Sequence, residues 1–185
     1  FPDMQLMGPH NRCNAEAAWL ACREFGVTEE AAARAVAAFQ PLEHRLEKVA
    51  ELNGVLYVND SKCTTVEALR VALSSFDRPV VLLAGGKFKG GDLPGLCPLL
   101  KEHARCVALF GASRGRFEPA WRDTLPVTWD RTLEQALRRV AGKDGQPALA
   151  HEGDVVLLAP ACSSYDQYPN YLRRGEDFKR VVHEV

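Results

Sequence analysis

Three polar segments each follow a short apolar run, and they hold most of the side chains that can do chemistry. In the first, residues 59–65, the carboxylate of Asp60 and the ammonium of Lys62 lie two positions apart. A carboxylate can accept hydrogen bonds from ribose hydroxyls, and an ammonium can neutralise a phosphate or a carboxylate. The spacing Thr64-x-x-Glu67 also fits a helix capping box, so the segment has a purely structural interpretation as well.

The second segment, residues 84–92, places four glycines around Lys87 and Lys89. Glycines let the backbone approach a charged ligand closely, and the structural alternative is a flexible turn with two solvated lysines. The pattern G-x-x-x-x-G-K-[ST] does not occur in the sequence, so no triphosphate cradle of the P-loop type is expected here.

The third segment, residues 160–168, offers hydroxyl groups and Cys162. A thiol near a helix start can have a lowered pKa and act as a nucleophile. No histidine at a suitable spacing identifies a base, however, and a buried inert cysteine is the commoner case. Tyr168 and Tyr171, three positions apart, are expected on the following helix, either packed on the sheet or at a ligand.

Two shorter signals lie nearer the amino terminus. Asn11 and Asn14 belong to the pattern H-N-x-x-N before the first predicted helix, and Asn14 taken alone would be an ordinary cap. His44 and Arg45 follow the expected domain junction. An arginine there makes either an ion pair between domains or a bidentate contact with a phosphate.

The hydrophobic pattern predicts the elements that position these segments. Residues 14–25 and 28–39 have apolar residues at helical spacing, and the pattern changes at Pro41. Strand-length runs at residues 46–52 and 55–58 flank Asn53-Gly54, which predicts an antiparallel hairpin. Further strands are expected at residues 80–84, 107–110, 127–129 and 155–159, and helices at residues 65–76, 95–104, 114–122, 133–141 and 168–183.

This alternation predicts an α/β fold with a Rossmann-like, mostly parallel sheet, flanking helices and an amino-terminal antiparallel hairpin, preceded by a helical segment. Ligands of such sheets bind beyond the carboxyl ends of the strands, where the three polar segments are expected. Lys plus Arg number 23 and Asp plus Glu number 24, so neither a nucleic acid nor a membrane surface is an expected partner. Six cysteines without a C-x-x-C pair favour the reducing cytoplasm over a zinc site or a disulfide framework.

One series of motifs runs along the chain in a fixed order. It comprises H-N-x-x-N (10–14), H-R (44–45), N-D-S-K-x-T (59–64), G-G-x-x-K-G (85–90), P-A-C-x-S-x-D-Q with a following aromatic residue (160–168), and R-G-x-x-F (174–178). The series resembles the Mur ligase family from about Gly8 to the end of the chain. The last three motifs are distinctive together, although none would suffice alone.

The resemblance implies that residues 1–41 are the carboxyl-terminal end of the family's central ATPase domain and that residues 42–185 are its amino-acid-binding domain. The implied reaction belongs to peptidoglycan synthesis. ATP phosphorylates a carboxylate of UDP-N-acetylmuramoyl-L-alanine, and the amine of D-glutamate attacks the acyl phosphate. The P-loop and the Mg²⁺ ligands of the family have no counterpart here, so this chain is expected to be inactive alone, to hold no metal and to carry no certain catalytic residue. A monomer is expected.

The same resemblance assigns site residues by motif match. ATP contacts fall to Asn11, Asn14, His44, Arg45, Asp60 and Lys62, and D-glutamate contacts to Thr64, Lys89, Cys162, Ser164, Tyr165 and Tyr171. There are departures from the family pattern: Cys63 and Thr65 stand where Ala and Asn are frequent, and Tyr171 stands where Phe is usual. Lys87 adds a positive charge where an acidic or neutral residue is expected, which leaves the contacts of the glycine loop open.

Two other functions stay open on the sequence. A sister ligase of the same architecture, adding another amino acid or adding glutamate to a folate, would share most of these motifs. The two lysine-bearing loops suit a dianionic amino acid. A stand-alone nucleotide- or metabolite-binding module is the third hypothesis, and the absence of an upstream P-loop in the gene would favour it.

Overall fold

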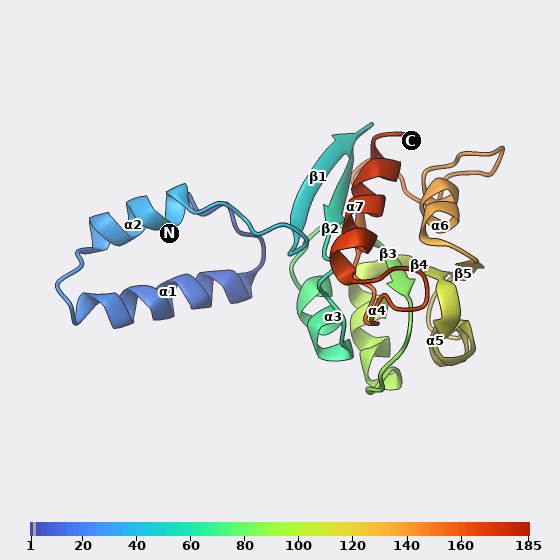
Figure 1. The fold of residues 1–185 in the computed structure, drawn as a ribbon, viewed down its shortest axis with the longest axis horizontal. Helices are drawn as coiled ribbons and strands as arrows, with labels where there is room; N and C mark the ends of the chain where they lie inside the picture. The colour runs from blue at the N-terminus through green and yellow to red at the C-terminus, as the bar shows by residue number, and fades with distance from the viewer. Residues whose placement is uncertain (2) are drawn as a thin grey trace. The chain divides into compact units, whose positions relative to one another are not determined.

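The computed structural model describes Phe1 and residues 3–185. The described chain forms two compact units, Phe1–Leu42 and Glu43–Val185. The first unit is helical and the second combines helices with a sheet (Figure 1). Their expected roles as the end of one ligase domain and the whole of another remain predictions.

The first unit consists of α1 (Pro9–Arg23) and α2 (Glu29–Ala38), which contact each other. α1 begins five residues before the expected start, because Pro9 has a helical φ and no N–H that would be left unpaired at this position. Asn14 therefore lies inside the helix, and its expected role as a cap is wrong. α2 begins after the cap Thr28, whose hydroxyl accepts the N–H of Ala31.

The second unit contains one six-stranded sheet in the order β1-β2-β6-β3-β4-β5. Its strands are β1 (Glu47–Leu52), β2 (Val55–Asn59), β3 (Val80–Gly85), β4 (Ala104–Phe110), β5 (Val127–Asp130) and β6 (Val155–Leu158). Only the β1–β2 pair of this sheet is antiparallel, which confirms the predicted fold class. The hairpin forms where Asn53 and Gly54 both have positive φ angles, 50° and 75°, as a tight two-residue turn requires.

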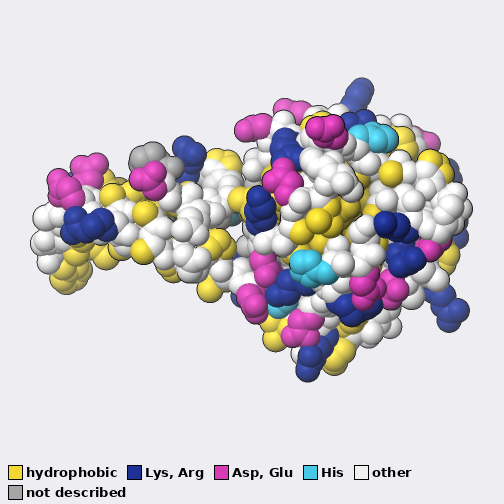
Figure 2. Space-filling view, turned by 90° about the horizontal axis from the view of Figure 1, so that it is seen from above, with side chains coloured by type: hydrophobic (Ala, Val, Ile, Leu, Met, Phe, Trp, Pro, Cys, Tyr) yellow, Lys and Arg dark blue, Asp and Glu magenta, His cyan; other side chains and the backbone are white. Residues whose placement is uncertain are grey.

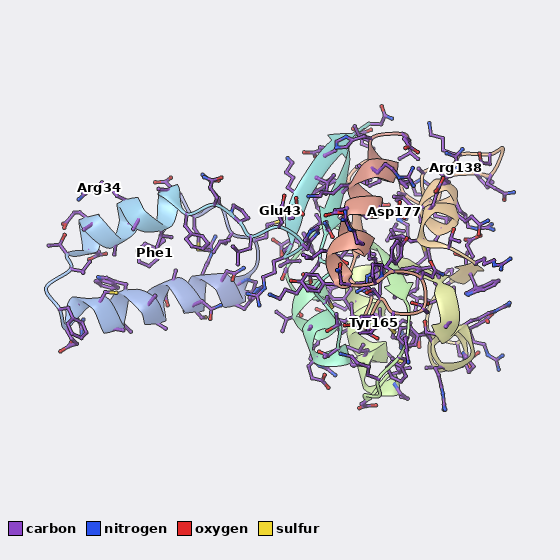
Figure 3. The ribbon with its side chains drawn as sticks, viewed as in Figure 1. Phe1, Arg34, Glu43, Arg138, Tyr165 and Asp177 are labelled. Carbon is purple, nitrogen blue, oxygen red and sulfur yellow. The ribbon has the colours of Figure 1, made fainter. Side chains whose placement is uncertain are left out.

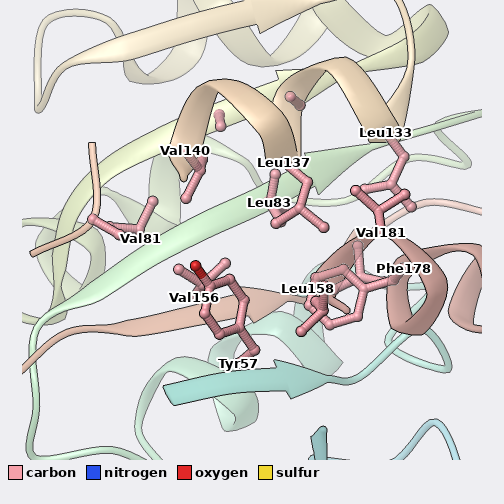
Figure 4. Packing of buried hydrophobic residues seen from close by; sticks show 14 of the residues in the cluster. Tyr57, Val81, Leu83, Leu133, Leu137, Val140, Val156, Leu158, Phe178 and Val181 are labelled. Atoms are coloured by element: carbon pink, nitrogen blue, oxygen red, sulfur yellow. The ribbon is translucent and has the colours of Figure 1, made fainter. Parts of the chain in front are cut away.

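Five helices accompany the sheet: α3 (Val66–Leu73), α4 (Cys97–His103), α5 (Arg114–Trp121), α6 (Leu133–Val140) and α7 (Tyr171–Val182), with 3₁₀ turns at Pro94–Leu96 and Gly111–Ser113. α6 and α7 pack on one face of the sheet, where Leu137 and Phe178 meet Leu83 and Leu158 (Figure 4). Every residue of β3 is buried, as expected for a central parallel strand.

Two helix starts differ from the sequence expectation. The cap of α3 is Thr65, whose hydroxyl accepts the N–H of Ala68, so the expected capping box at Thr64 is wrong. α7 begins at Tyr171 after the cap Asn170, so Tyr168 precedes this helix instead of lying on it. In both cases the helix begins directly after the residue whose side chain accepts a free N–H of the first turn.

The return of β6 between β2 and β3 has a direct consequence for the polar segments. They follow β2, β3 and β6, which are three neighbouring parallel strands with their carboxyl ends at one edge. The order of the strands across the sheet also changes direction at β6, which lies between β2 and β3. Ligands of parallel α/β sheets bind at such positions.

Candidate functional site

Backbone hydrogen bonds join the three polar segments at this edge. The N–H of Gly85 donates to the carbonyl of Pro160 at 3.0 Å, and Lys87 and Ser163 exchange two N–H···O bonds of 2.9 and 3.1 Å. The N–H of Ala161 donates to the carbonyl of Cys63 at 3.0 Å. The third segment thus lies between the other two and fixes both.

Gly86 shows how closely the second and third segments approach. A Cβ at this position would lie 2.4 Å from the carbonyl oxygen of Ser163, and its φ of 128° disfavours any other residue. The glycine here serves the packing of two loops, so the interpretation of a merely flexible turn does not hold for it.

Arg174 links the same segments through its side chain. Its guanidinium is fully buried and donates to the Ser61 hydroxyl (3.0 Å), the Ser61 carbonyl (2.8 Å) and the Cys162 carbonyl (3.0 Å). Burial lowers the pKa of Arg174 to about 10, which leaves it charged at neutral pH. The Ser61 hydroxyl in turn donates to the Tyr171 carbonyl at 2.7 Å, so Arg174 also connects the first segment to α7.

Sequence reasoning did not assign a role to Arg174. A signal was available, because Tyr171, Arg174, Phe178 and Val181 recur at helical spacing and Phe178 and Val181 lie in the core. That period places Arg174 on the buried face of α7. A buried arginine needs hydrogen-bond acceptors, and in this fold the backbone of the two loops provides them.

His44, assigned to ATP, is buried and faces the sheet. Its Nδ1 lies 2.9 Å from the amide nitrogen of Asn59, and its N–H donates to Glu47 at 2.9 Å. A Cβ at Gly175 would lie 2.1 Å from His44 Nδ1, so the ring fills a space that this glycine leaves. The His44 carbonyl accepts the N–H of Lys62. The ring therefore fixes the backbone next to Arg45.

Asp60 is the most perturbed acid of the site. Only 9% of it is exposed, and burial raises its pKa to about 6, opposed by the Leu46 N–H and by the charge of Arg45. Arg45 itself is exposed. At neutral pH the Asp60 carboxylate is mostly ionised and able to accept hydrogen bonds.

The raised pKa of Asp60 predicts a stability effect. Because the folded state holds this proton more tightly than the unfolded state, stability falls as pH rises from about 4 to about 6. Asp60→Asn should therefore be more stable than the native chain at pH 7, by at most about 3 kcal/mol, and the difference should vanish near pH 4. Urea unfolding of both chains across this pH range measures it. Equal stability at pH 7 would contradict the buried carboxylate.

The remaining second-unit candidates lie at the same edge. The ammonium of Lys62 is 5.8 Å from the ring centroid of Tyr171, and Lys62 and Lys89 are both exposed. Thr64 is partly buried. Their side chains form no hydrogen bond or ion pair with the rest of the described chain.

The third segment offers both buried and exposed groups. Ser164 is 3% exposed, whereas Tyr165 is 69% exposed (Figure 3). Burial raises the pKa of Cys162 to about 12, which disfavours the thiolate that a nucleophile at this position would need. Tyr168 is not a ligand candidate either, because its hydroxyl donates to Asp177 at 2.6 Å.

Asn11 and Asn14, the remaining candidates for ATP, belong to the first unit. Both residues border a mainly apolar cavity of about 290 Å³ between α1 and α2, together with side chains such as Val36 and Phe39. The Asn11 amide also donates to the Met7 carbonyl at 2.7 Å.

Phe1 and residues 3–185 contain no group of three His, Cys, Asp or Glu side chains that could hold a metal ion. Over the same residues, no helix is long and apolar enough to cross a membrane. Figure 2 shows basic and acidic side chains interspersed over the visible face of the second unit, in line with the net charge of −1.

No family model matches the sequence, but curated relatives match it over its full length. The UDP-N-acetylmuramoylalanine–D-glutamate ligase of Lawsonia intracellularis is 63% identical over 185 residues, which are 100% of this chain and 41% of that protein. The chain thus spans about two fifths of this relative's length.

Among solved structures, the UDP-N-acetylmuramate-alanine ligase of Thermotoga maritima has a TM-score of 0.68 at 14% identity, covering 98% of this chain and 39% of that one. Folylpolyglutamate synthase of Mycobacterium tuberculosis has a TM-score of 0.66 at 17% identity, covering 95% and 41%. At these identities the two structures show a shared fold. Over its whole length the chain is similar in sequence to the carboxyl-terminal part of D-glutamate-adding ligases of the Mur family.

Proposed function

We propose that the chain is part of an ATP-dependent ligase that joins D-glutamate to UDP-N-acetylmuramoyl-L-alanine through an acyl phosphate. The observation that carries this proposal is the 63% identity, over every residue of the chain, with a relative of that name. The arrangement at the sheet edge supports it, because three loops with carboxylate, ammonium and hydroxyl groups meet there around β6.

D-glutamate is proposed to bind beside the second and third segments. The side chains of Lys89 and Thr64 form no hydrogen bond or ion pair within the described chain, so both are available to bind a carboxylate. The Ser164 hydroxyl, at 3% exposure, is likewise unpaired among the described residues and can donate to the second carboxylate. Cys162 would line the pocket as a neutral, inert group, and Tyr165 and Tyr171 would cover it.

ATP is proposed to bind on the β2 side of the same edge. Asp60 would accept the ribose hydroxyls, with Lys62 nearby, and Arg45 would reach the phosphates. His44 belongs to this set as a positioning residue, because its buried ring fixes the backbone beside Arg45. Asn11 and Asn14 would contact the adenine through the cavity in the first unit.

The first unit is proposed to be the end of a larger ATPase domain. Its only buried helical residue is Ala32 among those that the structure describes. Large apolar side chains of this unit are exposed instead: Leu20, Phe25, Val27, Phe39 and Leu42. Residues of the remaining domain would cover them in the intact protein. The second unit, with its own core, would be the amino-acid-binding domain.

Mg²⁺ and the P-loop belong to the intact enzyme in this proposal. The described residues offer no cluster of metal ligands, so no step is assigned to a metal here. The chain's own contribution is binding and orientation: its cations hold the carboxylates of D-glutamate and turn the amine toward the acyl phosphate, while Arg45 offsets phosphate charge. A monomeric state and a cytoplasmic location are part of the proposal, and cell fractionation and sedimentation of the intact protein would test them.

Phosphate release by the intact protein tests the function. With ATP, Mg²⁺ and UDP-N-acetylmuramoyl-L-alanine present, we expect release that depends on D-glutamate and that other amino acids or folates do not replace. The 185-residue chain alone should release none, because the phosphate cradle is missing. Equal turnover with another amino acid would favour a sister ligase, and no turnover by the intact protein would favour a binding module.

A further inference from the structure

The backbone on both sides of Arg45 has an uncommon conformation. His44 and Leu46 have φ angles of 63° and 41°, in the left-handed region that residues other than glycine rarely adopt. Both side chains are buried, whereas Arg45 between them is exposed. A strained backbone of this kind persists only where the surrounding contacts hold it, and it is frequent at functional sites. The shape of this segment therefore depends on its neighbours.

The backbone of the segment is hydrogen-bonded at three points. The N–H of His44 donates to the carboxylate of Glu47 at 2.9 Å. The carbonyl of His44 accepts the N–H of Lys62 at 3.1 Å. The N–H of Leu46 donates to Asp60 Oδ1 at 3.4 Å. The segment is thus tied to β1 and to the polar residues that follow β2.

Asn59, the first residue of the N-D-S-K-x-T motif, connects the His44 ring to Glu47. Asn59 is fully buried, and its Oδ1 accepts the N–H of Ser61 at 3.1 Å. This bond turns the amide nitrogen the other way, where it lies 2.9 Å from His44 Nδ1 and 2.9 Å from Glu47 Oε2. Its two hydrogens have one acceptor each, so Nδ1 accepts and Nε2 carries the ring hydrogen.

Glu47 is the acceptor that these contacts share. It lies opposite Asn59 in the β1–β2 pair, so the hairpin sets its position. Its Oε2 accepts from the His44 N–H and from Asn59, and its Oε1 accepts from the ammonium of Lys179 at 3.1 Å. One carboxylate therefore joins the backbone next to Arg45 to β2 and to α7.

The side chain of Arg45 is left available by this arrangement. Arg45 is exposed and forms no ion pair with Phe1 or residues 3–185. A backbone that is already fixed reduces the entropy lost when the guanidinium binds an anion. Glu47 and Asn59 have no place among the residues proposed to touch a substrate, and their polar groups are used within the fold. Any effect they have on the reaction must reach it through their neighbours.

We infer that Glu47 and Asn59 are positioning residues for Arg45. They hold the backbone of residues 44–46 in its left-handed conformation and so direct the guanidinium toward the phosphates of ATP. The inference rests on the proposed phosphate contact of Arg45, and it gives a function to the asparagine that opens the N-D-S-K-x-T motif.

Kinetics of the intact protein test the inference. Glu47→Ala should lower kcat/KM for ATP at least about tenfold and leave the KM for D-glutamate unchanged, because the phosphate contact is misplaced. Glu47→Gln should recover most of the loss, since its carbonyl oxygen can still accept from His44 and Asn59. Glu43→Ala is the matched control: Glu43 also adjoins His44 and pairs with Lys179, but its side chain is 75% exposed. It should change neither constant.

A double-variant comparison separates this inference from the proposed function. Arg45→Ala alone should lower kcat/KM for ATP at least about 30-fold. Adding Glu47→Ala should then lower it less than about twofold further, because the two residues act as one unit. If Arg45→Ala has no effect, the proposed phosphate contact fails and the inference fails with it. If Arg45→Ala lowers the rate but Glu47→Ala does not, or if the two effects multiply, the inference alone is overturned.

Hydrogen exchange of the 185-residue chain gives a readout that does not need activity. In Glu47→Ala and Asn59→Ala, the amides of Leu46 and Lys62 should exchange at least about tenfold faster, while the buried amides of β3 keep their protection. Asn59 is fully buried, so Glu47→Ala decides the test if Asn59→Ala does not fold. Unchanged exchange at Leu46 and Lys62 in Glu47→Ala, or equal acceleration throughout β3, would overturn the inference.

Discussion

Replacing Arg174 with methionine should lower the free energy of unfolding by about 3 kcal/mol. The substitution leaves the carbonyls of Ser61 and Cys162, which accept from the guanidinium at 2.8 and 3.0 Å, without a donor in a buried site. Removing a buried charge offsets part of that loss, since burial alone depresses the Arg174 pKa. Urea unfolding of the chain measures the difference.

Arg174→Lys should destabilise at least as much as the methionine variant. Lysine keeps the charge in the buried site, but its ammonium lacks the planar fork that reaches three acceptors on two loops. The neighbour Arg173 is the control, because it is exposed and pairs with the exposed Glu176. Arg173→Met should change stability by no more than about 1 kcal/mol. Equal effects at both positions would contradict the role of Arg174.

The same variants test whether Arg174 positions the site. In the intact protein, kcat/KM should fall at least about 100-fold at a temperature where the variants are folded, because the first and third segments shift relative to each other. A merely structural role would lower the melting temperature and leave kcat/KM of the folded protein unchanged.

Replacing Lys89 with alanine should raise the KM of the intact protein for D-glutamate at least about 30-fold, since loss of a charged contact in a closed site costs about 2 to 5 kcal/mol. Lys89 lies in the glycine loop, and its charge reaches the buried thiol of Cys162 in the third segment. The exposed Lys101 on α4 is the control. Lys101→Ala should leave the KM for D-glutamate unchanged.

The sequence predicted the sheet well because its signals are local. Asn53-Gly54 specifies the turn of a hairpin by backbone conformation alone, and the unbroken apolar run of β3 specifies a central strand. Placing the polar segments at one edge needed only the rule that parallel strands end together.

The features that sequence reasoning missed depend on contacts between distant residues. Arg174 meets Ser61 across 113 positions, and only the folded chain shows that backbone carbonyls surround the guanidinium. The burial that raises the pKa of the Cys162 thiol likewise comes from the packing of several elements. The predicted start of α3 was wrong for a local reason. Thr64 and Thr65 are adjacent and equally suited to a cap by residue type, and only the backbone geometry places the Thr65 hydroxyl at the N–H of Ala68.

The central claim is that one sheet edge binds two substrates, D-glutamate beside Lys89 and ATP beside Asp60. The most direct test measures the KM for both substrates in the intact protein carrying either Lys89→Ala or Asp60→Asn. The predicted pattern is crossed: Lys89→Ala raises mainly the KM for D-glutamate, and Asp60→Asn raises mainly the KM for ATP. If both variants raise the KM for the same substrate, or if the pattern is reversed, the placement of D-glutamate beside Lys89 and of ATP beside Asp60 is contradicted.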